Sequence, residues 1–131
     1  MDKRRLMGYR ALQKEIKELQ QERERLEAGI LGAVRFDRLP GGGGVGDPVG
    51  VLATKLAELD ALLAGRTALL IERRIEIENA IGGLPDSRDR RLIHLRYICG
   101  KSWEDVAWEL GYEKRWVLVL HGRILRKMAE D

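Results

Sequence analysis

The chain has 131 residues, of which 34% are charged and only 5% are aromatic, and its formal net charge is +3. This length allows one modest domain, or a small domain with an extended element, and the shortage of strand-forming residues predicts an all-α protein. Split at Gly83, the first part holds 14 Lys and Arg against 13 Asp and Glu, and the second holds 10 against 8. Neither part has the strongly basic composition that alone would indicate nucleic-acid binding.

Cysteine and histidine are too few to indicate a metal or disulfide site. Cys99 is the single cysteine, which fits a reducing compartment, and we expect a buried thiol that ends a helix. The spacing of Cys99 from His94 and His121 in the sequence does not match that of metal-ligating residues, so we expect no metal and no cofactor. No apolar run approaches the ~20 residues of a bilayer span, and no signal-peptide core follows Met1. We therefore expect a soluble cytoplasmic protein without membrane contact.

Catalytic patterns are also absent from the sequence. The carboxylates lie on polar helix faces, where solvated charge is the usual state. His94 and His121 each adjoin a leucine, as structural histidines often do, and no Ser/His/Asp or Cys/His arrangement has a supporting motif. The sequence thus predicts a protein that is not an enzyme.

The first predicted element is a helix over residues 4–34 with one narrow apolar seam. Arg23 interrupts the seam, whose apolar members follow the alternating 3,4 spacing of a coiled coil: Leu12, Ile16, Leu19, Leu26 and Ile30. Because the other faces are polar, this helix needs a partner helix to bury the seam.

A second long helix begins at Asp47-Pro48, a helix cap followed by a proline suited to the first turn. Nothing ends this helix before Gly82-Gly83, although Arg66 and Arg73 interrupt its apolar seam. Its seam has the same spacing: Val49, Leu52, Leu56, Leu59, Leu63, Leu70 and Ile77. We predict that residues 1–83 form an antiparallel helical hairpin. Leu62 and Leu69 lie beside the seam, where a second copy would cover them, so a homo-oligomer is expected.

The segment 37–47 between the two helices is rich in glycine. Gly41 and Gly46 have the outer spacing of a phosphate-binding loop. That loop continues with Lys and Ser or Thr, whereas Asp47-Pro48 follows here, and no strand precedes it. A flexible connector is the prediction.

Residues 84–131 are predicted to form a second domain, with the hinge at Gly82-Gly83-Leu84-Pro85. Asp86 caps a helix over Ser87–Cys99, which offers Leu92, Ile93, Leu95 and Ile98 to a core and ends at Gly100. About 45 residues are close to the lower limit for independent stability. This domain is therefore expected to lean on the hairpin or on a second subunit.

A helix-turn-helix pattern covers residues 102–123. Ser102 is a cap with Asp105 three residues on, and Gly111 suits the positive φ that ends a helix. The core spacing comes from Val106, Ala107, Leu110, Val117 and Leu120. Such a motif places its second helix in a DNA major groove.

The flanks of this motif carry a resemblance to known proteins. Leu84-Pro85, the run Leu95-Arg96-Tyr97 and the downstream segment 124–128 together resemble the fourth region of housekeeping-type sigma factors, over residues 84–128. The whole chain also resembles small phage and prophage proteins akin to late transcription activators of the RinA and ArpU type. Segments 102–104, 109–112 and 120–123 carry that second resemblance, together with the loop that ends at Gly46-Asp47.

The resemblance implies sequence-specific binding of double-stranded DNA in phage gene control, with RNA polymerase positioned at a late promoter. Candidate contacts to base edges lie at the start of the second helix: Glu113, Lys114, Arg115, Trp116, Leu118 and Val119. Candidate phosphate contacts are Arg123, Arg126 and Lys127, with Arg88 and Arg91 at the start of the preceding helix. A solvated charged face stays open as the alternative. Among the tryptophans, Trp103 is expected in the core and Trp108 half exposed, while Trp116 either packs or contacts DNA.

Two other functions stay open. A phage assembly protein, such as a small terminase subunit, also joins a helix-turn-helix to helical oligomerisation elements. An RNA polymerase interaction module without DNA recognition is the third hypothesis. A ring-sized oligomer favours the terminase, and polymerase binding without DNA binding favours the module.

Leu118 and Val119 depart from the polar or aromatic side chains usual at these places in the similar proteins. With Val117 and Leu120 turned inward, Leu118 and Val119 cannot both be buried, because successive helical residues are about 100° apart. Contact with thymine methyl groups is one explanation. Burial against a partner or against the hairpin, which would mask the helix, is the other.

Overall fold

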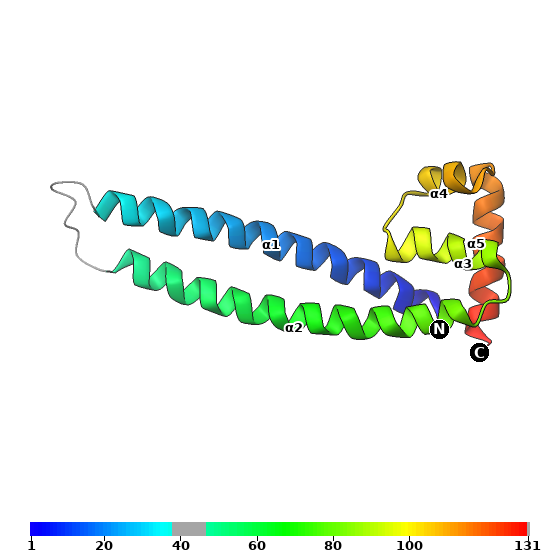
Figure 1. The fold of residues 1–131 in the computed structure, drawn as a ribbon, viewed down its shortest axis with the longest axis horizontal. Helices are drawn as coiled ribbons and strands as arrows, with labels where there is room; N and C mark the ends of the chain where they lie inside the picture. Colours follow the sequence, from blue (N-terminus) through cyan, green and yellow to red (C-terminus); the bar gives the residue numbers. More distant parts are fainter. Residues whose placement is uncertain (38–46, 131) are drawn as a thin grey trace. The chain divides into compact units, whose positions relative to one another are not determined.

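The computed structural model describes residues 1–37 and 47–130, and every element in these ranges is helical (Figure 1). The elements are α1 (Lys3–Asp37), α2 (Pro48–Gly82), α3 (Ser87–Ile93), the π-helical segment η1 (His94–Ile98), α4 (Trp103–Leu110) and α5 (Lys114–Ala129). The predicted all-α class is confirmed. Gly41 and Gly46, on which the prediction of a glycine-rich connector rests, lie outside the described residues.

The chain divides into two compact units. Unit 1 comprises Met1–Gln13 and Leu70–Asp131, and unit 2 comprises Lys14–Leu69. This division differs from the expected boundary between residues 83 and 84. The reason lies in the core, because Leu6 and Tyr9 of α1 and Ile77 and Ile81 of α2 belong to the same buried cluster as the C-terminal helices.

The core of unit 1 explains how a short C-terminal segment becomes stable. Its buried members from the C-terminal part of the chain are Leu84, Leu92, Ile93, Leu95, Tyr97, Ile98, Val106, Ala107, Val117, Leu120, Ile124 and Met128. Gln13 of α1 adds a polar link, since its Nε2 donates to the carbonyl of Ile98 at 3.0 Å. The ends of the two long helices thus supply apolar surface that the last 45 residues lack.

The segment interpreted as a hinge is anchored in this core. Leu84 is buried, and its N–H donates to the carbonyl of Ile81 at 3.0 Å. Its own carbonyl accepts a hydrogen bond from Arg90 Nη1 at 2.6 Å. The backbone at Leu84 is therefore held from both sides, which a freely moving hinge would not be.

Unit 2 contains two helical segments held along one seam. Ile16 is buried, and the other seam positions, including Leu19, Leu26 and Leu59, are half-buried. Two arginines interrupt the apolar seam of unit 2, and both are paired across it. Arg23 Nε lies 2.5 Å from Asp60 Oδ1, and Arg66 Nε lies 2.9 Å from Glu15 Oε1. The interruptions are thus filled by ion pairs between the two segments.

The helix predicted over Ser87–Cys99 is divided between α3 and η1. Asp86 caps it as expected, its Oδ1 accepting from the Arg88 N–H at 2.8 Å. The last turn widens, with the Cys99 N–H bonded to the His94 carbonyl five residues back. The expected burial of Cys99 is wrong: its thiol is exposed, because Ile98 occupies the inward position and the next residue turns outward. Cys99 Sγ lies 3.6 Å from His94 Nδ1.

Candidate nucleic-acid interface

The connection between α4 and α5 is a short turn set by local side chains. Ser102 Oγ accepts a hydrogen bond from the Asp105 N–H at 3.1 Å at the start of α4. Gly111 ends α4 with φ of +73°, and the Tyr112 N–H then bonds to the Ala107 carbonyl at 3.0 Å. These are the features expected of a capped helix with a left-handed glycine at its end.

α5 has a fully buried side that fixes it on unit 1. Val117, Leu120, His121, Ile124 and Met128 are buried, at spacings of three and four residues. Val106 and Ala107 of α4 belong to the same core, and the small Ala107 allows close approach of a neighbouring helix. The buried side of α5 therefore determines which side chains face outward.

The outward side of α5 brings together several of the candidate DNA contacts. Arg115, Val119 and Arg126 are separated by four and seven residues, so they follow one line along the helix. All three are exposed, and Trp116 and Arg123 adjoin this line on one flank. Leu118 and Val119, at 41% and 42% exposure, both lie outside the core, which agrees with the expectation that they cannot both be buried.

The two helices of the motif have opposite charge. α5 carries five Lys and Arg residues and no acidic residue, whereas α4 carries three acidic residues and no basic one. Part of this charge is paired, since Lys114 Nζ lies 2.5 Å from Glu104 Oε1. Lys101 Nζ likewise lies 3.3 Å from Glu109 Oε1.

Lys127 also has an intramolecular partner. Its Nζ lies 3.3 Å from Oδ2 of Asp89, a carboxylate only 2% exposed, and Arg88 Nε lies 3.7 Å from the other carboxylate oxygen. Burial of a carboxylate without a cation is unfavourable, so this pairing stabilises α3 against α5. Asp89 was not expected from the sequence, where it is one of several acids near a helix start. By contrast, Arg115 and Arg126 form no ion pair among the described residues.

The candidates on α3 are placed differently from one another. Arg88 is held by Asp86 and Asp89, and its guanidinium lies 5.9 Å from the Tyr112 ring centroid, next to the turn. Arg91 lines a surface pocket with Glu78 and His94, on the side of α3 that meets the end of α2. Arg88 therefore adjoins the α4–α5 motif, while Arg91 faces the end of α2.

The tryptophans occupy three different environments. Trp103 packs against the core, and the Arg96 guanidinium stacks 4.3 Å over its ring. Trp116 is 39% exposed, with Arg123 5.3 Å from its ring centroid. Trp108 is 85% exposed, so the expectation of half exposure is wrong: it lies on the outer face of α4, opposite Val106 and Ala107.

A buried aromatic cluster lies on the inner side of α5. The Tyr97 hydroxyl and His121 Nε2 share a hydrogen bond of 2.6 Å, and the Trp103 ring meets the imidazole edge-on at 4.5 Å. Burial is the main factor that lowers the pKa of His121, to about 4, and the charges of Lys3 and Arg96 act in the same direction. Burial also raises the pKa of Tyr97. His121 is therefore neutral at pH 7 and has a structural role in the core.

Neither of two other site types occurs in the part of the chain that the structure describes. Residues 1–37 and 47–130 contain no group of three His, Cys, Asp or Glu side chains placed to hold a metal ion. In the same residues, no helix is both long enough and apolar enough to cross a membrane.

Comparisons with known proteins add no relative. No protein family, no curated protein and no solved structure matches this chain.

Proposed function

We propose that the protein is a DNA-binding transcription regulator of a phage or prophage, with α4 and α5 acting as a helix-turn-helix like that of sigma region four. The exposed cationic face of α5 is the observation that carries this proposal. Arg115 and Arg126 stand on one line with Val119, without intramolecular ion pairs among the described residues, on a helix whose reverse side is buried. Such a helix meets two requirements of groove binding, a free face and a fixed orientation.

The dimensions of α5 support the proposal. A helix with its side chains is about 10–12 Å across, close to the ~12 Å width of the major groove. From Arg115 to Arg126 the face extends about 16 Å, at ~1.5 Å per residue. The N-terminal residues of α5 then contact base edges, and Arg123 and Arg126 contact phosphates. The part of the proposal that places the protein at late promoters rests on the sequence resemblance.

The experiment is selection of bound sequences from random duplex DNA, followed by affinity measurements over a range of salt. The double variant Arg115→Ala, Arg126→Ala is expected to lose at least tenfold in specific affinity, with a salt slope smaller by about one unit because Arg126 contacts a phosphate. A matched control is Lys14→Ala, Lys17→Ala, which removes two exposed cations of unit 2. Equal losses in both variants would exclude α5 as the binding face.

A second candidate function is protein interaction through α4, as in an RNA polymerase interaction module. Glu104 and Asp105 lie four and three residues before Trp108, so the three share one exposed face. An acidic face with a large exposed aromatic side chain is unfavourable against DNA phosphates and suits a basic protein surface. Trp108→Ala separates the two functions: it weakens polymerase binding under the second and leaves affinity for isolated DNA unchanged under the first.

Unit 2 is proposed as the assembly element of the regulator. Leu62 is exposed beside the seam, and a second copy would cover it. Because helix-turn-helix proteins commonly bind paired half-sites, a dimer suits the regulator. A ring-sized mass in solution would instead favour the DNA-packaging subunit.

A further inference from the structure

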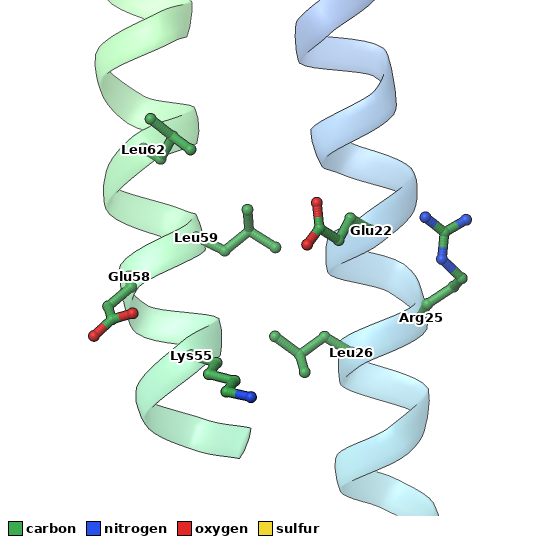
Figure 2. A pocket seen from close by; sticks show the side chains of 7 residues that line it. All are labelled: Glu22, Arg25, Leu26, Lys55, Glu58, Leu59 and Leu62. Carbon is green, nitrogen blue, oxygen red and sulfur yellow. The ribbon is translucent and has the colours of Figure 1, made fainter. Parts of the chain in front are cut away.

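Unit 2 has an open groove on one side of its helical seam (Figure 2). The groove encloses about 690 Å³, and Leu26 of α1 and Leu59 of α2 point toward one another across it. Leu62 continues the apolar lining and is 43% exposed. The remaining lining residues are charged: Glu22, Arg25, Lys55 and Glu58.

The two sides of the seam differ in how their charges are satisfied. Glu58 and Asp60 flank Leu59, and because successive helical residues are about 100° apart they lie on opposite sides of it. Asp60 is paired with Arg23 across the helices, so that side is closed. On the groove side, none of the four charged lining residues forms an ion pair among the described residues.

The Arg23–Asp60 pair also fixes which residues stand level with one another. The two helical segments run in opposite directions, so Arg25, two residues after Arg23, is level with Glu58, two residues before Asp60. Figure 2 shows their side chains pointing away from one another, on opposite rims of the groove. Each rim therefore carries an unpaired charge at the same height, positive on α1 and negative on α2.

We propose that a second copy of this chain covers the groove, with the two-fold axis parallel to the helices. This arrangement deepens the assembly part of the proposed function and rests on it, but it does not depend on DNA binding. Rotation about such an axis exchanges the rims without changing their height. Arg25 then meets Glu58 of the partner subunit, and Glu58 meets Arg25 of the partner subunit. Leu26, Leu59 and Leu62 become the centre of a four-helix bundle.

The two possible axes differ in which residue each of these two charges meets. A two-fold axis lying in the same face, but across the helices at the level of Arg25 and Glu58, would leave each of these two charges opposite itself. Arg25 would then face Arg25 of the partner subunit, and Glu58 would face Glu58 of the partner subunit. Like charges opposed at an interface are unfavourable, and of these two axes the parallel one brings Arg25 opposite Glu58 of the partner subunit.

The test uses charge reversals at the two rims. Arg25→Glu and Glu58→Arg each place like charges opposite one another in a homodimer, and both positions are exposed, so folding is preserved. Each single variant is expected to raise the dimer dissociation constant at least tenfold, measured by sedimentation. The double variant Arg25→Glu, Glu58→Arg restores both pairs and the dimer. Glu24→Arg, a reversal at another exposed position of α1, is the matched control and leaves the dimer unchanged.

An equimolar mixture of the two single variants distinguishes a partner contact from a contact within one chain. In a heterodimer, the reversed charge of the Arg25→Glu chain meets the reversed charge of the Glu58→Arg chain, and these two are opposite in sign. The remaining pair is the natural one, so the mixture is expected to dimerise. A pair within each chain would not be restored by mixing.

Four outcomes of these measurements overturn the inference. They are a monomeric natural chain, a ring-sized oligomer, single variants that dimerise normally, and a mixture that stays monomeric. Because mass is measured without DNA, a failure of DNA binding leaves this result unaffected.

Discussion

The Tyr97 hydroxyl lies 2.6 Å from His121 Nε2 in the core beneath α5, with both side chains buried. This pair connects η1 to the helix proposed to enter DNA. Trp103 closes the cluster from α4. His121 is thus one of the buried residues that hold α5 on the core, and burial lowers its pKa to about 4.

The first prediction concerns pH. The pKa of His121 is lowered from 6.5 to about 4 in the folded protein, so between these values the unfolded chain binds more protons. Stability then rises with pH in this window and is lost as pH falls from 6.5 toward 4. At pH 4.5 the contribution of His121 to the free energy of unfolding is lower by about 2–3 kcal/mol than at pH 7, at 1.36 kcal/mol per pKa unit.

Urea unfolding at pH 7 and pH 4.5 measures this loss, with His121→Gln as the control that removes the titrating group. Carboxylates titrate in both proteins, so the informative quantity is the difference between their pH dependences. The natural chain is expected to lose more stability than the variant. An identical pH dependence in both proteins would show that His121 is not buried as a neutral group.

The second prediction concerns the turn between α4 and α5. Gly111→Ala is expected to destabilise the protein by about 1–2 kcal/mol, because a Cβ is unfavourable at φ of +73°. Apart from the neighbouring residues in the chain, no atom of the described residues lies within 4 Å of the added carbon, so backbone strain is the cause. Gly122→Ala is the matched control: within α5 its Cβ makes only an ordinary contact of 3.9 Å with Arg126, and it stabilises by up to about 1 kcal/mol. If Gly111→Ala and Gly122→Ala shift the midpoint of urea unfolding in the same direction, this explanation is wrong.

Local features of the fold could be predicted from sequence because they depend on neighbouring residues. Asp47, Asp86 and Ser102 accept the hydrogen bonds expected of helix caps, and Gly111 has the expected positive φ. The inward positions of Val117 and Leu120 followed from helical spacing alone. These assignments need no knowledge of what packs against each helix.

Features that depend on distant contacts could not be predicted in this way. Leu6 and Tyr9 are fully part of the core of unit 1, yet nothing near them in sequence indicates a partner about 70 residues away. Lys114 stays a candidate DNA contact, but its pairing with Glu104, ten residues earlier, was not predicted. Asp89 is buried only because Lys127 and Arg88 lie beside it. Spacing within one helix does not indicate such partners.

The third prediction compares two adjacent cations at the end of α5. Arg126→Ala is expected to reduce the salt slope of DNA binding by about one unit, since its charge has no ion-pair partner among the described residues. Lys127→Ala is expected to change the slope less, because Asp89 already neutralises that charge. Titrations at several salt concentrations measure both variants. If Lys127→Ala has the full effect, the lysine exchanges Asp89 for a phosphate on binding.

The last prediction concerns Leu118 and Val119, two adjacent apolar side chains on the outward part of α5. Val119 stands in line with Arg115 and Arg126, whereas Leu118 is about 100° away around the helix. If thymine methyl groups explain these residues, Val119→Ser is expected to reduce preference for A·T-containing sites about tenfold, a loss of about 1.4 kcal/mol. Leu118→Ser is then expected to have a smaller effect.

The alternative explanation, a masked recognition helix, predicts the opposite behaviour of the same variants. A helix hidden against a protein surface is released when its apolar contacts are weakened, so serine at both positions would strengthen DNA binding or change the oligomeric state. Sequence selection on each variant, with mass in solution measured in parallel, distinguishes the two. Groove contact requires that the double variant keep its mass and fold while losing site preference. Tighter binding, or a new mass, would mean that Leu118 and Val119 face protein rather than DNA.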